Sequence, residues 1–78
     1  MHRGIDREAI RRRLSEAQEH VLLCAWHVAR QRARIKDLIS KGHDWEHSWE
    51  LLTTLEESRI LHVQRVERLK QVLRDADT

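Results

Sequence analysis

Proline, phenylalanine and tyrosine are absent from this 78-residue chain, and glycine occurs only at Gly4 and Gly42. Almost nothing in the sequence therefore interrupts a helix, because proline and glycine are the residues that disfavour helical backbone most. The remainder is rich in Leu, Ala, Glu, Arg and Gln, a composition typical of long helices. The composition predicts an all-α protein.

Cysteine and long apolar runs are also scarce. The single cysteine, Cys24, excludes an internal disulfide. The longest apolar run, Val21 to Trp26, has six residues, whereas a membrane span needs roughly 20. We therefore expect no membrane partner and a cytoplasmic location, where an unpaired thiol stays reduced. A core this small supplies little stability, which favours association with a second copy of the chain.

A heptad pattern of mostly apolar residues runs through the first half of the chain. It predicts a helix over about residues 5–40, in which Gln31 is the only clearly polar seam residue. The pattern alternates steps of four and three residues through Ile10, Leu14, Ala17, Val21, Cys24, Val28, Gln31, Ile35 and Leu38.

A turn is predicted at residues 41–44. Gly42 can adopt the left-handed backbone that ends a helix, and Asp44 can cap the next one. A connection this short makes the two helices antiparallel neighbours.

The heptad pattern resumes after the turn and predicts a second helix over about residues 45–75. Its seam positions are Ser48, Leu52, Leu55, Arg59, His62, Val66, Leu69 and Leu73. Residues 1–41 carry ten Arg and Lys against five Asp and Glu, whereas residues 44–78 carry five against eight, so the two helices attract each other. Residues 1–78 thus form a single domain, an antiparallel two-helix hairpin that resembles a coiled coil.

Apolar residues beside both seams predict a homodimer or a higher homo-oligomer. Two wide apolar stripes would pack as a four-helix bundle made of two hairpins. The expected interface residues are Leu22, Trp26, Ala29, Ala33, Trp45, Trp49, Ile60 and Val63. Polar residues at or beside the seam would fix register, as a buried asparagine does in coiled coils, and these are His27, Gln31, Glu56, Arg59 and His62.

A metal site is an alternative function. His20, Cys24 and His27 stand at i, i+4 and i+7, within a narrow arc of one helix face. If the turn centres near Gly42, His62 lies opposite Cys24, between His20 and His27 in height. Imidazole and thiolate are the ligands that zinc prefers. We favour packing over metal at these positions, and hence no cofactor, because cysteine often serves as a small core residue.

Nucleic-acid binding is a second alternative. Arg11-Arg12-Arg13 and the arginines at 30, 32 and 34 could contact phosphates along one face of the first helix. Interleaved carboxylates and interhelix pairs, such as Arg30 opposite Glu56, account for these charges equally well. We therefore do not expect a nucleic-acid partner.

Two segments, HVARQRARIKDLISKGHD at 27–44 and LLTTLEESRILHVQRVERL at 51–69, carry a family resemblance. They resemble short bacterial helical-hairpin proteins, found chiefly in rhizobia and their relatives, that lack an assigned function. The resemblance covers roughly residues 14–70, and the sequence departs from it at Trp45, His47 and Trp49, where the relatives have smaller residues. The matching positions are His27, Arg30, Gln31, Arg32, Gly42, Asp44, Leu51, Leu52, Glu56, His62 and Arg65.

An enzyme is not expected, because the sequence has no glycine-rich phosphate loop and no nucleophile with a plausible base, and a narrow bundle offers no cleft. The sequence therefore predicts a small non-enzymatic interaction or regulatory module that self-associates, with a further protein partner left open.

Overall fold

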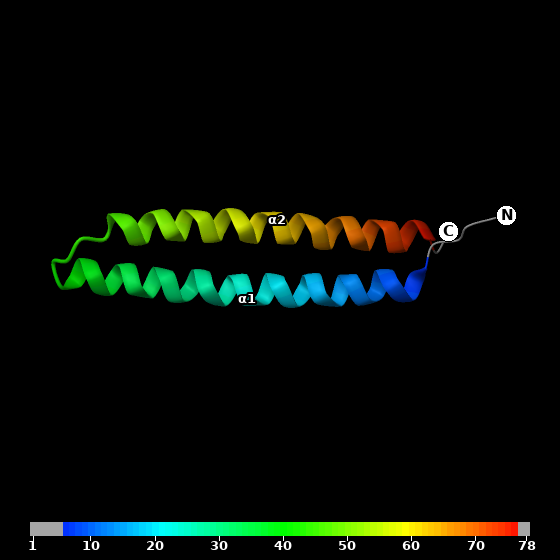
Figure 1. Ribbon diagram of the computed structural model, residues 1–78, viewed down its shortest axis with the longest axis horizontal. Coiled ribbons are helices and arrows are strands. Elements are labelled where there is room, and N and C mark those ends of the chain that lie inside the picture. The colour runs from blue at the N-terminus through cyan, green and yellow to red at the C-terminus, as the bar shows by residue number, and fades with distance from the viewer. Residues whose placement is uncertain (1–5, 77–78) are drawn as a thin grey trace.

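The computed structural model describes residues 6–76. These residues form two helices, α1 (Arg7–Ser40) and α2 (Glu46–Ala76). The helices run antiparallel and lie side by side along their length (Figure 1). The prediction of an all-helical hairpin is thus confirmed. Neither helix carries an apolar stretch long enough to cross a bilayer, within the part of the chain that the structure describes.

Local hydrogen bonds explain where α1 begins and ends. The Asp6 carboxylate accepts from the Ala9 backbone N–H at 3.1 Å, as an N-cap residue does, so the helix starts at Arg7 rather than near residue 5. Position 5 itself lies outside the described residues. At the other end Gly42 has a φ of 72°, and the His43 N–H donates to the Leu38 carbonyl at 2.9 Å. Only glycine takes this left-handed conformation without strain, which is why α1 stops here.

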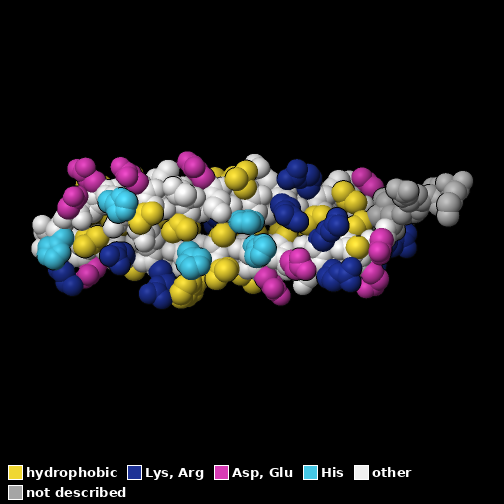
Figure 2. All heavy atoms as spheres, in the orientation of Figure 1, with side chains coloured by type: hydrophobic (Ala, Val, Ile, Leu, Met, Phe, Trp, Pro, Cys, Tyr) yellow, Lys and Arg dark blue, Asp and Glu magenta, His cyan; other side chains and the backbone are white. Residues whose placement is uncertain are grey.

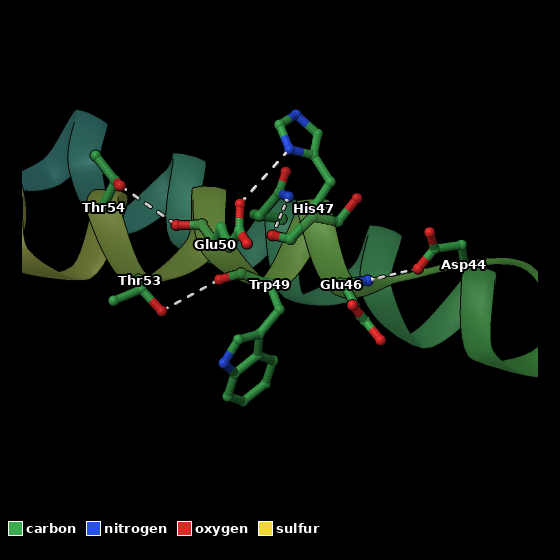
Figure 3. Close-up of polar contacts among 9 residues, drawn as sticks. Asp44, Glu46, His47, Trp49, Glu50, Thr53 and Thr54 are labelled. Carbon is green, nitrogen blue, oxygen red and sulfur yellow. Dashed lines mark hydrogen bonds and ion pairs between the residues drawn. The ribbon is translucent and has the colours of Figure 1, made fainter.

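The start of α2 is capped by Asp44, whose carboxylate accepts from the Glu46 N–H at 3.0 Å. Figure 3 shows this bond at the point where the extended connection becomes helical. The helix therefore begins at Glu46, one residue later than the pattern predicted. Figure 1 also shows that α2 starts inward from the end of α1, because the return segment is extended.

The core is the seam between the two helices. Its most buried side chains are Ile10, Ala17, Val28, Ile35, Ser48, Leu52 and Val66. Val28, Ile35 and Leu52 form the central cluster, and the half-buried Leu55 packs against it. The other predicted seam residues are half-buried, with one exception. Arg59 is exposed, since an unpaired guanidinium remains in water.

Contacts at each end of the hairpin align the helices. Near the turn, the Gln31 side-chain amide donates to the Ser48 backbone carbonyl at 2.7 Å in a partly buried position. At the open end, the Arg7 guanidinium donates to the Ala76 carbonyl at 2.5 Å. The seam is therefore held in one register from the turn to the far end.

Candidate interaction surfaces

The seam leaves two long faces of the hairpin, which differ in chemistry. His20 and Leu22 stand two residues apart on α1, and Val63 and Arg65 do so on α2. Two residues correspond to a rotation of about 200° around a helix. Leu22 and Val63 line one groove together, whereas His20 packs on His62, one helical turn before Arg65. The two faces are thus opposite.

The apolar face consists of residues on the same side of their helix as Leu22 or Val63. These residues are Leu22, Ala29, Trp49, Ile60 and Val63. Its groove is lined by Val21, Leu22, Val63 and Val66, and bordered by Gln18, Glu67 and Lys70. Leu22 is 72% exposed and Val63 is 38% exposed. An isolated hairpin therefore leaves the apolar side chains of this groove in water.

Trp49 extends this apolar face toward the turn. Figure 3 shows Trp49 and His47 projecting from opposite sides of α2. The Trp49 ring packs edge-on against Trp45, with centroids 6.2 Å apart. The exposed His47 imidazole lies 3.8 Å from the Glu50 carboxylate. The Thr53 hydroxyl donates to the Trp49 backbone carbonyl at 3.2 Å, a bond within α2 that leaves the indole ring free.

The Trp26 ring lies outside the apolar groove, although Trp26 stands four residues after Leu22 and the sequence pattern placed both in one interface. Its ring lies 5.0 Å from the His27 ring, and the Arg30 guanidinium carbon lies 4.8 Å from the Trp26 ring centroid. These three residues line a separate shallow hollow with Gln31, Arg34 and Leu55. Ala33 stands eleven residues after Leu22, about three helical turns, and so lies on the side of Leu22. The expected interface is thus divided between two faces.

The predicted metal ligands are only partly brought together. The His20 and His62 rings are 5.3 Å apart, so α1 and α2 each present a histidine at this level, although His62 was expected opposite Cys24. His27 is exposed and packs against Trp26 on its own helix, and Cys24 is a half-buried free thiol. Residues 6–76 contain no group of three or more His, Cys, Asp or Glu placed to hold a metal ion. The four-residue set is therefore not assembled.

Only some of the predicted register-setting residues make contacts across the seam. Gln31 bonds across the seam to Ser48, and Glu56 pairs with Arg32 at 3.7 Å rather than with Arg30. His62 packs on His20. His27 and Arg59 are both exposed.

The basic face is defined by five arginines, Arg13, Arg30, Arg34, Arg65 and Arg68. Arg30 and Arg34 line the hollow beside Trp26, and Arg65 and Arg68 line a second hollow with Leu69 and Val72. Arg13 stands seven residues before His20, on the same side of α1. Figure 2 shows Arg, Lys and His side chains along this side of both helices, interspersed with hydrophobic side chains, and acidic side chains mostly toward the rims.

Ion pairing differs between the two faces. On the apolar side, Arg11 pairs with Glu8, Arg32 with Glu56 and Lys70 with Glu67, at 3.5, 3.7 and 3.5 Å. The five arginines of the basic face form no ion pair with any residue in the described range 6–76. Sequence reasoning missed this surface because it considered the arginines of the first helix alone. The available signal was Arg13, His20, His27 and Arg34, which recur every seven residues.

Comparisons with protein-family models, with curated proteins and with solved structures find no match to this chain. The resemblance to rhizobial hairpin proteins stays a prediction, and the function rests on the two faces themselves.

Proposed function

We propose that this protein is a small non-enzymatic interaction module that self-associates, with two hairpins packing apolar face to apolar face as a four-helix bundle. The observation that carries the proposal is the groove between α1 and α2, where Leu22 is 72% exposed beside Val63. A chain of this size gains little stability from one helix pair, and covering this groove would add apolar burial at about 25 cal/mol per Å².

The size of the face suits a second copy. At 1.5 Å per residue, α1 is about 51 Å long, and the hairpin is 17 Å across. Such a face offers on the order of 800 Å² per copy, which is typical of stable protein complexes. A two-fold dimer also presents the same groove from both sides, so each Leu22 meets an apolar surface.

Charge favours one arrangement of the four helices. The half of the chain containing α1 carries ten Arg and Lys against five Asp and Glu, and the half containing α2 carries five against eight. Placing α1 beside the α2 of the second copy brings opposite charges together, whereas α1 beside α1 brings like charges together. Both turns then lie at the same end of the bundle.

The test is the mass of the protein in solution, measured by light scattering and sedimentation equilibrium. We expect a dimer for the natural sequence and a monomer for the variant Leu22→Glu with Val63→Glu, because each copy would bring two buried carboxylates to the interface. Leu23→Glu is the matched control, since Leu23 is 53% exposed and one position removed from the groove. A monomer for the natural sequence, or equal dissociation by the control, would contradict the proposal.

A further inference from the structure

Arginines recur along the basic face from near the open end of the hairpin to near its turn. Arg13 and Arg34 are 21 residues apart, or about 31 Å along α1. Arg65 and Arg68 come from the other helix and line a hollow on the same face. The row therefore combines two helices and is long enough to contact several phosphate groups. We infer that the basic face binds single-stranded nucleic acid.

The arginines of this face are available to a ligand. No ion pair within residues 6–76 would have to break before Arg30, Arg34 or Arg65 contacted a phosphate. Arginine also suits this role because its planar guanidinium donates two parallel hydrogen bonds to phosphate oxygens. Glu16 lies near this row on α1, and the five arginines outweigh its charge.

Trp26 adds an exposed aromatic ring to the arginines of the basic face. It is 51% exposed, and its hollow is shared with Arg30 and Arg34. The Arg30 guanidinium already lies over the indole ring, 4.8 Å from its centroid. Proteins that bind single strands combine a basic track for the backbone with an aromatic ring on which a base stacks. Trp26 between two arginines provides this combination.

The length of the surface favours a single strand over a duplex. A flexible strand can bend to follow arginines spread over two helices, whereas each strand of a duplex has a fixed path that winds away from the surface. Membrane binding is separated from binding to a single strand by the vesicle measurement below. The groove beside Leu22 and Val63 shares no lining residue with the hollow beside Trp26, so binding does not depend on the proposed self-association.

The first test measures binding of a fluorescein-labelled 15-nucleotide oligo(dT) by fluorescence anisotropy at several salt concentrations. Five phosphate contacts on a single strand give a log–log salt slope of about −3.5, or about 100-fold weaker binding between 50 and 200 mM salt. We expect Trp26→Ala to weaken binding at least about fivefold and to leave the salt slope unchanged. Trp49→Ala is the matched control, because Trp49 is 53% exposed on the apolar face, and it should bind like the natural sequence.

A second pair of variants tests the arginines. Arg30→Gln with Arg34→Gln should reduce the size of the salt slope by about 1.4, which corresponds to two lost contacts. Arg11→Gln with Arg32→Gln removes the same charge from the other face and should leave the slope unchanged.

Three results would overturn the inference. These are equal weakening by both arginine pairs, equally tight binding of a 15-base-pair duplex, and binding to phosphatidylserine vesicles without binding to the oligonucleotide. A protein that binds the oligonucleotide as a monomer would contradict only the self-association, so the two proposals fail separately.

Discussion

Replacement of Leu52 by alanine tests the packing of the hairpin most directly. Leu52 is the most buried residue of the central cluster and contacts side chains of both helices. Leucine-to-alanine changes in protein cores cost about 2–5 kcal/mol, depending on how far the neighbours close the cavity. Here the neighbours belong to one helix pair and can relax, so we expect a loss of about 2.5 kcal/mol.

This loss is large for a core of one helix pair, which rarely supplies more than about 3–5 kcal/mol. At 4–8 °C per kcal/mol, the melting temperature should fall by roughly 10–20 °C. The assay is thermal unfolding followed by circular dichroism at 222 nm, at one fixed protein concentration, because self-association makes the midpoint concentration-dependent.

Leu61→Ala is the control for the same chemical change at an exposed position. It should alter the free energy of unfolding by less than about 0.5 kcal/mol, as surface substitutions usually do. If Leu61→Ala were as costly as Leu52→Ala, or if Leu52→Ala cost less than about 1 kcal/mol, the assignment of the seam to these positions would be wrong.

Three further predictions concern the turn, the seam and metal. Gly42→Ala should lower the free energy of unfolding by about 1 kcal/mol in a thermal melt. The added Cβ meets no atom within 4 Å, so the cost comes from the positive φ alone. An unchanged free energy of unfolding would mean that residue 42 does not have this left-handed conformation. Gln31→Leu should change the free energy of unfolding in urea by less than about 0.5 kcal/mol, because the buried leucine offsets the lost hydrogen bond to Ser48. Gln31→Ala loses the hydrogen bond without that burial and should cost about 1–2 kcal/mol. Excess zinc should leave the melting temperature unchanged, and a zinc-dependent rise that disappears in His62→Ala would contradict this.

The seam could be predicted from the sequence because a heptad pattern reports directly which side chains face a neighbouring helix. Buried Val28, Leu52 and Val66 all lie at predicted positions. Arg59 occupies a seam position and is nevertheless exposed, since the pattern records spacing and takes no account of the cost of burying a charge.

The register across the hairpin was harder to predict. We expected His62 between His20 and His27, and the structure pairs it with His20 alone. The expectation assumed a turn symmetric about Gly42. The return segment is extended, and an extended residue spans about 3.3 Å against 1.5 Å in a helix. Fewer residues are therefore needed to reach a given height on α2, which shifts every cross-helix pair.

The sequence predicted the apolar face better than the basic face. Leu22 and Val63 were expected at an interface, and they line the same groove. Trp26 was expected beside them because it is apolar and near Leu22. Its contact with Arg30 fits the spacing of residues four apart on a helix, but Leu22 is also four residues away, so spacing alone does not decide where the ring packs. Apolar character alone does not decide which face a tryptophan occupies when cations flank it.

A single connection between the helices also determines the order in which contacts can form during folding. The bond between Gln31 and Ser48 joins residues 17 positions apart, whereas that between Arg7 and Ala76 joins residues 69 positions apart. Loop-closure entropy rises by about 0.6 kcal/mol for each doubling of the loop, so the outer contact costs about 1.2 kcal/mol more if it forms first. Contacts near the turn should therefore form before those at the open end, and amide hydrogens near Gln31 should be the first to become protected from exchange during refolding.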